Sequence, residues 1–273
     1  MIEKVKKEKA RNILIIIVVS SFIVVAIGSI IGNEKTITTS TLITGTQKIE
    51  WGIKRNKDNK QPDVGITNKA LLEKNNGICM GNDSKPYIYI TFDEGYESGY
   101  TSKILDTLKD NDIKATFFIT GHYLNSATDI VKRMIDEGHI VGNHTVNHKS
   151  MPEINEGKLK EEVMNLHNSV KEKFNYKMKY LRPPKGEFSE SSLIQTNALG
   201  YKTVMWSFAY ADWDEKNQPS EQEGKEKILN NLHNGEIVLL HATSRTNTNI
   251  LDEVIKEIKN KGFEFKSLDE FEK

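Results

Sequence analysis

Short runs of β-branched and aromatic residues alternate with segments of helical period from residue 86 to the end of the chain. Runs of this kind, bounded by polar residues, are typical of buried strands. The strand candidates are 87–92, 115–119, 139–143, 178–181, 202–206, 236–240 and 263–267. The pattern therefore predicts about seven strands in this part of the chain.

Five of the segments between these strands repeat apolar residues three or four positions apart, as amphipathic helices do. They are 102–111, 129–138, 159–174, 190–200 and 249–262. Alternation of strand and helix implies parallel strands, because each right-handed crossover packs its helix back onto the sheet. About seven such units in one domain predict an α/β fold with a closed or nearly closed parallel (β/α) barrel, similar to a distorted TIM barrel, rather than an open doubly wound sheet.

The N-terminus has a different pattern. Residues 1–12 are rich in lysine and arginine, and residues 13–31 form an uncharged apolar run. A helix of that length spans a hydrocarbon core of about 30 Å. We predict a cytoplasmic basic tail at 1–12 and a transmembrane anchor at 13–31, with the rest of the chain outside the cytoplasm. A cleaved signal peptide is the alternative and would give a secreted protein, but the run is longer than a usual signal sequence and no A-x-A site follows it.

Composition narrows the functional classes. The 273 residues include 38 basic and 38 acidic side chains, so the chain lacks the positive charge by which proteins bind nucleic acid. The single cysteine, Cys79, cannot form an internal disulfide and is typical of a small buried residue.

Residues 32–85 are polar, with Trp51 as a packing point, and we interpret them as a stalk and N-terminal extension of a domain at 86–273. We expect a monomer.

Charged and polar side chains follow five of the predicted strands. In a parallel barrel the carboxyl ends of the strands meet at one rim, where catalytic residues gather. Each of these side chains alone has an ordinary structural explanation, such as a helix cap or a surface ion pair. Their joint placement favours an active site. The residues are Asp93, Glu94, His144, His148, Arg182, Asp212, Trp213 and His241.

His144 and His148 are four residues apart, a spacing that can bring two imidazoles to one cation. Two histidines in a surface loop can have the same spacing. The spacing alone leaves both interpretations open, and the surrounding motifs must decide between them.

Five short motifs, in order, resemble those of a known family. TFDEG (91–95), HTVNH (144–148), RPPKG (182–186), DW (212–213) and LLH (239–241) are similar to the motifs of the polysaccharide deacetylases, also called the NodB-homology or carbohydrate esterase 4 family. The resemblance covers residues 86–270. It implies the NodB-homology barrel fold and hydrolysis of an N-acetyl group on a sugar, which gives a free amine and acetate.

A narrower resemblance extends toward the N-terminus. Trp51-Gly52, residues 54–56, Gln61-Pro62, DEGYESGYT (93–101) and RPPKGEFSE (182–190) are similar to the sporulation muramic-acid deacetylases, which help to make muramic δ-lactam in spore cortex peptidoglycan. This resemblance implies N-deacetylation of N-acetylmuramic acid, with peptidoglycan glycan strands as the partner. It places the catalytic domain in the cell envelope or the forespore intermembrane space.

By the same resemblance, His144 and His148 would hold a divalent cation, with zinc expected and manganese or cobalt as alternatives. The family has a second aspartate, normally the third metal ligand, at the position of Glu94. Glutamate is one methylene longer than aspartate. Glu94 could therefore complete the metal site with a shifted geometry, or it could turn away and leave a two-histidine site.

The resemblance implies four catalytic residues. Asp93 would be the general base that activates water, and His241 would be the general acid. Arg182 would orient Asp93 and keep it ionised, while Asp212 would hold His241 and raise its pKa. These pairs supply what hydrolysis of an amide requires.

The expected substrate-binding residues include Lys185, which stands in RPPKG where many family members carry an aromatic residue. Our hypothesis is that Lys185 attracts the lactyl carboxylate of muramic acid once the peptide stem has been removed. A solvated lysine at a loop tip is the alternative, because exposed ion pairs contribute only about 0–1 kcal/mol. Of the other members of this set, Trp213 would wall the groove and Leu239 would line the acetyl-methyl pocket. The full set is Tyr96, Lys185, Trp213 and Leu239.

Two other functions compete with this one. The first is deacetylation of another glycan, such as peptidoglycan N-acetylglucosamine, chitin or xylan. The second is a membrane-tethered glycan-binding protein whose chemistry was lost through Glu94. The retained acid, base and orienting residues argue against the second, because a binding module needs none of them.

Overall fold

The computed structural model describes residues 45–272. The predicted basic tail and anchor at 1–31 lie outside the described residues, as does the first part of the predicted stalk. No helix within 45–272 is long and apolar enough to cross a membrane. All the elements described below belong to one compact unit that begins at Lys48.

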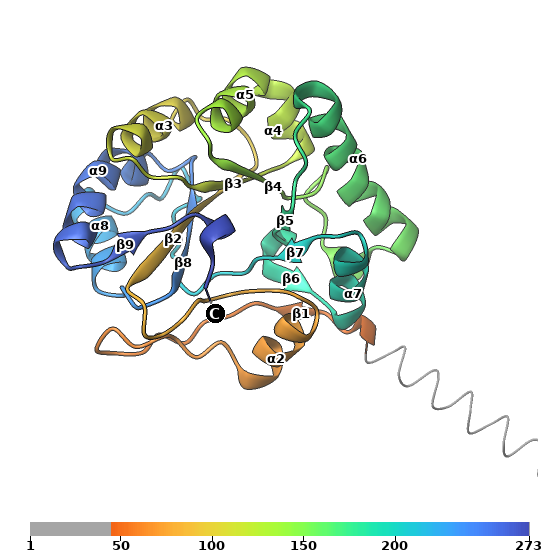
Figure 1. Ribbon diagram of the computed structural model, residues 1–273, viewed down its shortest axis with the longest axis horizontal. Helices are drawn as coiled ribbons and strands as arrows, with labels where there is room; N and C mark the ends of the chain where they lie inside the picture. Colours follow the sequence, from red (N-terminus) through yellow and green to blue (C-terminus); the bar gives the residue numbers. More distant parts are fainter. Residues whose placement is uncertain (1–44, 273) are drawn as a thin grey trace, which may run out of the picture. The chain divides into compact units, whose positions relative to one another are not determined.

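The central feature is a curled parallel sheet of seven strands (Figure 1). The strands run in the order β7-β5-β4-β3-β2-β8, and β9 pairs with β2. Every strand pair within this sheet is parallel, as predicted. The strands are β2 (Tyr87–Glu94), β3 (Thr116–Ile119), β4 (Ile140–Asn143), β5 (Tyr180–Leu181), β7 (Lys202–Thr203), β8 (Glu236–His241) and β9 (Glu264–Phe265).

The sheet forms a half-barrel. After β7 the chain bends toward β8, where Leu239 N donates to Phe208 O at 2.8 Å and Ser207 N donates to Ile237 O at 3.0 Å. These bonds join the segment after β7, at one edge of the sheet, to β8 at the other edge. The predicted α/β architecture is confirmed, and the predicted barrel takes the form of this curled half-barrel.

Helices cover the outer face of the sheet (Figure 1). The five predicted helices are present as α3 (Thr101–Asp110), α5 (Thr128–Asp136), α6 (Glu156–Phe174), α7 (Glu190–Ala198) and α9 (Arg245–Asn260). Three more were not predicted: α2 (Ile66–Lys74), α4 (Gly121–Ser126) and α8 (Glu221–Leu229). Short 3-10 turns are η1 (Met151–Glu153), η2 (Pro184–Gly186) and η3 (Leu268–Glu270).

Strand β2 separates two apolar layers. Because successive side chains of a strand point to opposite faces, Ile88, Ile90 and Phe92 pack in the layer shared with the helices, and Tyr89 packs in the interior of the half-barrel. The same alternation assigns Asp93 to the interior face and Glu94 to the helix face. This difference decides what each carboxylate can contact.

The N-terminal extension packs on the sheet. Strand β1 (Ile49–Glu50) pairs antiparallel with β6 (Glu187–Phe188). Next to it, Trp51 is buried against Phe188, and its indole N–H donates to the carbonyl of Trp206 at 2.9 Å. Cys79 is buried in the same cluster, as its solitary occurrence suggested. The extension thereby supports the loop that contains η2.

Candidate active site

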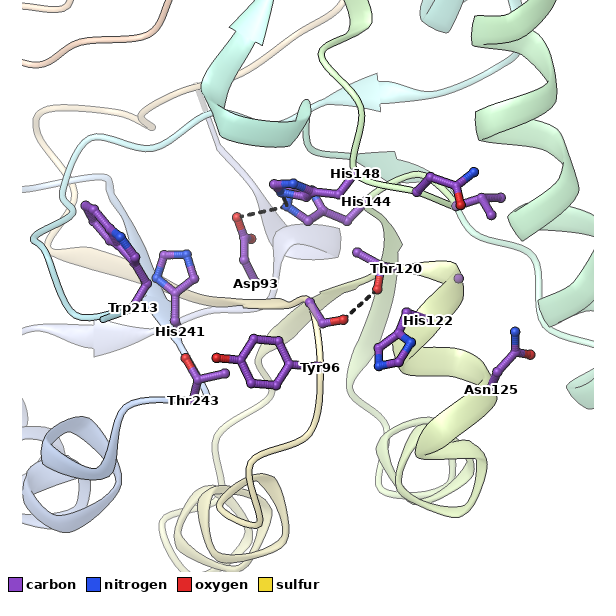
Figure 2. A pocket seen from close by; sticks show the side chains of 14 residues that line it. Asp93, Tyr96, Thr120, His122, Asn125, His144, His148, Trp213, His241 and Thr243 are labelled. Carbon is purple, nitrogen blue, oxygen red and sulfur yellow. Dashed lines mark hydrogen bonds and ion pairs between the residues drawn. The ribbon is translucent and has the colours of Figure 1, made fainter. Parts of the chain in front are cut away.

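Five of the eight predicted rim residues line two adjoining cavities at the carboxyl ends of the strands. One cavity, of about 780 Å³, is lined by residues that include Asp93, His144, His148, Trp213 and His241 (Figure 2). The other, of about 400 Å³, shares all five and adds side chains from the chain segments near η2 and β7. Both volumes lie in the range of clefts that bind small molecules.

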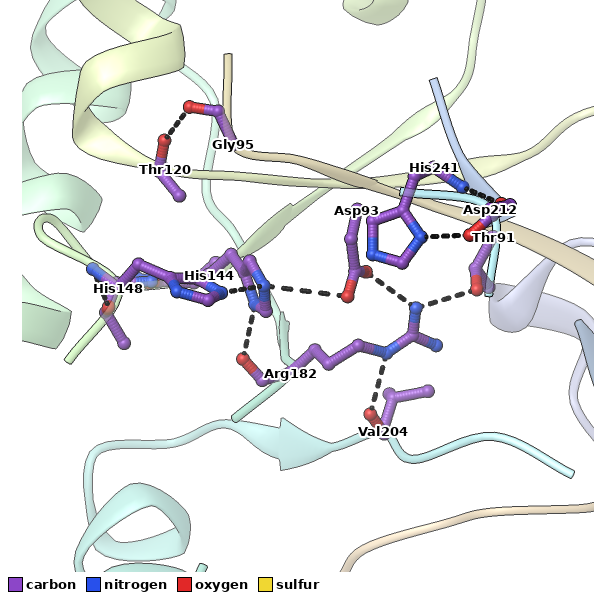
Figure 3. A network of polar contacts seen from close by, with 12 residues as sticks. Thr91, Asp93, Gly95, Thr120, His144, His148, Arg182, Val204, Asp212 and His241 are labelled. Carbon is purple, nitrogen blue, oxygen red and sulfur yellow. Dashed lines mark hydrogen bonds and ion pairs between the residues drawn. The ribbon is translucent and has the colours of Figure 1, made fainter. Parts of the chain in front are cut away.

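Arg182 holds Asp93 in place from below (Figure 3). The guanidinium is fully buried, and its Nη1 donates to Asp93 Oδ1 at 2.8 Å and to Thr91 Oγ1 at 2.8 Å. Its Nε donates to Val204 O at 3.1 Å, and the group stacks over the Phe118 ring. Burial alone would raise the pKa of Asp93, but the charges of Arg182 and of the nearby histidines lower it below its usual value. Asp93 is therefore an ionised carboxylate, ready to accept a proton.

The two histidines of HTVNH face each other beside Asp93. His144 Nδ1 lies 2.8 Å from the carbonyl of Arg182, so it carries the proton and donates, which leaves a lone pair on Nε2. That Nε2 lies 3.1 Å from His148 Nε2 and 3.5 Å from Asp93 Oδ2. Burial lowers the pKa of both histidines, that of His148 to about 4. Neutral imidazoles bind divalent cations, and here the two Nε2 atoms are close enough to reach one cation.

These donors fit a cation held by two histidines. Within residues 45–272, no group of three or more His, Cys, Asp or Glu side chains is arranged to hold a metal ion. At the rim of the two cavities, the donor set consists of His144 and His148, with one oxygen of Asp93 beside them. Of the two alternatives for position 94, this matches the two-histidine site.

Glu94 is placed differently from the expected third ligand. It is fully buried, and neither carboxylate oxygen has a hydrogen-bond partner among the described residues. Burial raises the pKa of Glu94 well above its usual value, and the neighbouring charges of Glu97 and Asp93 raise it further. Glu94 is on the helix face of β2, and it is not among the described residues that line either cavity. Of the two alternatives that the sequence left open, this position is that of a Glu94 turned away from the two histidines.

His241 is paired with Asp212 on the other side of Asp93 (Figure 3). His241 Nδ1 lies 2.7 Å from Asp212 Oδ1, and the backbone N–H of His241 donates to Asp212 Oδ2 at 2.8 Å. Burial alone would lower the pKa of His241, but the hydrogen bond and charge of Asp212 raise it above its usual value. A histidine with a raised pKa keeps its proton near neutral pH and can act as a general acid.

One positioning residue was missed by the sequence analysis. Asn247, in the first turn of α9, donates from Nδ2 to Asp212 Oδ2 at 2.5 Å and accepts a hydrogen bond from Tyr210. It is almost fully buried. No motif marks this asparagine, although its place at the start of the helix that follows His241 is a weak signal in retrospect.

The predicted substrate-binding residues divide between the cavities. Trp213 is 57% exposed and packs edge-on against His241, and Tyr96 is 45% exposed at the rim of the larger cavity. Leu239 and Lys185 line the smaller one. Lys185 has a φ of 60° and is followed by Gly186, where a Cβ would lie 2.7 Å from the Trp206 ring. The loop is thereby held tightly, with the Lys185 side chain exposed at the mouth of the smaller cavity.

Comparison with known proteins gives consistent results. The polysaccharide deacetylase family matches residues 80–204. The peptidoglycan-N-acetylmuramic acid deacetylase PdaA of Bacillus subtilis is 41% identical over 83% of this chain and 88% of its own length. The solved structure of that protein, described as a family 4 carbohydrate esterase, superposes with a TM-score of 0.81 at 40% identity, over 83% of this chain and 97% of that one. A peptidoglycan-N-acetylglucosamine deacetylase of Bacillus cereus is 32% identical over 73% of this chain and 73% of its own length.

Proposed function

The chain belongs to the polysaccharide deacetylase family, carbohydrate esterase family 4, and is a peptidoglycan deacetylase; within that activity, we propose that its substrate is N-acetylmuramic acid. The family resemblance predicted from the five motifs is confirmed. The muramic-acid specificity is supported by the name of the Bacillus subtilis relative and by the chemistry of the smaller cavity.

The observation that carries this proposal is the lining of the 400 Å³ cavity. Leu239 offers an apolar surface for an acetyl methyl group, and Lys185 offers a positive charge in the same space. Muramic acid is the peptidoglycan sugar that has both an acetyl group and a lactyl carboxylate. N-acetylglucosamine lacks the carboxylate and would leave the Lys185 ammonium without an anionic partner.

The first step of the reaction is attack of water on the acetyl carbonyl carbon. Asp93, ionised by its contact with Arg182, accepts the proton that the water loses as the new carbon–oxygen bond forms. When bound at His144 and His148, a divalent cation supplies positive charge that polarises the acetyl oxygen. The family is generally metal-dependent, and we propose zinc as the cation, with manganese or cobalt as alternatives.

The second step is cleavage of the carbon–nitrogen bond. His241 donates its proton to the leaving nitrogen, so that the sugar departs as a neutral amine and the acetyl group as acetic acid, which ionises to acetate; the proton held by Asp93 replaces the one that His241 gave up. Asp212 stabilises the protonated imidazole and fixes its orientation through two hydrogen bonds. Trp213, at the edge of His241, walls the groove on this side.

We place this activity in the cell envelope. The basic and apolar segments at 1–31 support a membrane anchor with the catalytic unit outside the cytoplasm. Deacetylation leaves an amine on the same sugar as the lactyl carboxylate, and these are the two groups that condense in a muramic δ-lactam. The proposed biological role is therefore the deacetylation step of lactam formation in spore cortex.

The test is acetate release by the full-length protein in detergent, stripped of metal and then supplied with zinc, manganese or cobalt. The substrates are glycan strands with and without peptide stems, and chitin oligomers. We expect metal-dependent release from stem-free muramic-acid strands and none from an Asp93→Asn variant. Faster release from chitin or from N-acetylglucosamine in peptidoglycan would favour another glycan, and no release from any substrate by the folded protein would favour a binding protein.

A further inference from the structure

The larger cavity extends beyond the reacting residues toward helix α4 (Figure 2). Trp213 and His241 lie at one side of Asp93, while His122 and Asn125 of α4 lie at the other. With a volume of about 780 Å³, this cavity is nearly twice the size of the one that contains Leu239 and Lys185. It therefore has room for a part of the substrate beyond the sugar that reacts.

Helix α4 is fixed against the loop that carries the two metal-binding histidines. The Thr120 side chain caps the helix by accepting from Tyr123 N at 3.1 Å, and it donates to Gly95 O at 2.9 Å. Gly121 N donates to Val146 O at 3.1 Å, and a Cβ at Gly121 would lie 2.9 Å from Val146 Cγ1. The position of α4 relative to the reaction centre is therefore well defined.

Two polar side chains of α4 are available for a ligand. His122 and Asn125 are one turn apart, are exposed, and have no side-chain hydrogen bond to any other residue in the range 45–272. An imidazole and a carboxamide can each donate and accept, as recognition of hydroxyl and acetamido groups requires. Among the described residues, neither lysine nor arginine lines this cavity, in contrast to the smaller one with Lys185.

This charge distribution matches the alternation of sugars in a peptidoglycan strand. Each stem-free muramic acid has a carboxylate, and the sugar next to it is an uncharged N-acetylhexosamine. Resting on the proposed function, we propose that His122 and Asn125 form a subsite that binds this neighbouring N-acetylated sugar by hydrogen bonds. The enzyme would then recognise a disaccharide or longer unit, with the muramic acid at Asp93 and its neighbour on α4.

The test compares the full-length wild type with a His122→Ala/Asn125→Ala variant on short and long substrates. Ser126→Ala is the matched control, because Ser126 is exposed on the same helix and bonds only to backbone carbonyls of α4. For each glycan series, the measured quantity is the ratio of kcat/KM on a tetrasaccharide to kcat/KM on a single N-acetylated sugar. Loss of two hydrogen bonds should lower this ratio about tenfold in the double variant and leave it unchanged in the control.

The outcome distinguishes the subsite from the proposed substrate. A ratio that is unchanged in the double variant, or equal losses on the short and long substrates, would overturn the subsite. The comparison is made on muramic-acid oligomers and on chitin oligomers, which also carry an uncharged N-acetylated neighbour. If the wild type prefers chitin, the muramic-acid proposal fails, and the ratio on chitin still decides whether α4 binds the neighbour.

A second inference comes from the backbone of the HTVNH loop. Thr145 and His148 have φ values of 65° and 54°, in the left-handed region that β-branched residues such as threonine strongly avoid. Glu162 of α6, only 1% exposed, accepts from Asn147 N and from Asn147 Nδ2, each at 2.7 Å. We infer that Glu162 is a positioning residue, which holds the strained loop so that His148 faces His144.

The readout for this inference is zinc affinity, measured by competition with a chromophoric chelator, together with thermal unfolding. Glu162→Ala and Glu162→Asp should weaken zinc binding about tenfold or more, because neither side chain can reach both donors. Glu162→Gln should restore most of the affinity, since the Asn147 amide can rotate to pair with it. Glu161→Gln, at an exposed neighbour bonded to Lys158, is the control. Wild-type affinity in both the Ala and Asp variants, or a Gln variant as weak as Ala, would refute the role.

Discussion

Replacement of Asp212 by asparagine tests whether the carboxylate keeps His241 protonated. Asp212 accepts from His241 Nδ1 at 2.7 Å and from His241 N at 2.8 Å, and it is fully buried. Burial opposes the protonated form of His241, so the raised pKa of this histidine depends on Asp212. In Asp212→Asn the burial remains and the charge is lost. The pKa of His241 should then fall, and the alkaline limb of the pH–activity profile should move to lower pH.

The magnitude follows from the strength of the lost interaction. A hydrogen bond to a charged partner contributes about 1.5–3 kcal/mol, which corresponds to a factor of about 10 to 100 in the protonation equilibrium of His241. Asp212 accepts from three donors, His241 Nδ1, His241 N and Asn247 Nδ2, and the amide of Asp212→Asn replaces one of its two oxygens by an N–H group, so at least one buried donor loses its acceptor. We expect the loss of this acceptor to lower the free energy of unfolding by about 1–3 kcal/mol.

The assay is kcat/KM for acetate release between pH 5 and pH 9.5, with chemical denaturation of the same preparations. Asp214→Asn is the matched control, because Asp214 is exposed two residues away and does not contact His241. Activity of Asp212→Asn relative to the wild type should fall by about 10- to 100-fold more at pH 9 than at pH 6. A relative activity that is the same at both pH values would refute the idea that Asp212 acts through the protonation of His241.

Four further predictions concern Glu94, Arg182 and Lys185. Glu94→Gln should leave the zinc affinity within about twofold of the wild type, whereas His148→Ala should lower it by about 10- to 100-fold. A comparable loss of affinity in both variants would show that Glu94 is a ligand. The pKa of Glu94 is higher in the folded than in the unfolded protein, so the wild type loses stability as the pH rises above the unfolded value. Glutamine cannot ionise and avoids this loss. The melting temperature of Glu94→Gln should therefore exceed that of the wild type by more at pH 8 than at pH 4. Arg182→Ala leaves the Asp93 carboxylate buried without its cation. The free energy of unfolding, measured by urea titration, should fall by about 3–5 kcal/mol, and the acid limb of the pH–activity profile should move to higher pH. An unshifted acid limb would contradict the pairing. Lys185→Ala should lower the ratio of rates on muramic acid and N-acetylglucosamine by up to about fivefold, and an unchanged ratio would mean that the lysine is only solvated.

The parallel α/β fold could be predicted because its signals are local. The long apolar strands and the five helices with a regular apolar period appear where the sequence predicted them. Helix α4 was missed because six residues are too few to establish a period, and α8 was missed because it buries only Gly224 and Ile228. The β1–β6 pair was missed because a two-residue strand has no pattern of its own.

The sequence by itself determined which chemical groups gather at the rim. Strand period and motif order brought the acid, the base and the two histidines to the carboxyl ends of parallel strands, because those ends always meet at one edge. Only the tertiary structure decided what each group contacts. Curling of the sheet brought Asp93 to Arg182, 89 residues away, a pairing that the family resemblance implied but that no strand or helix pattern shows. Packing left the adjacent Glu94 in the helix layer without a partner among the described residues. Such long-range contacts depend on sheet order and packing, which no local pattern of residues encodes.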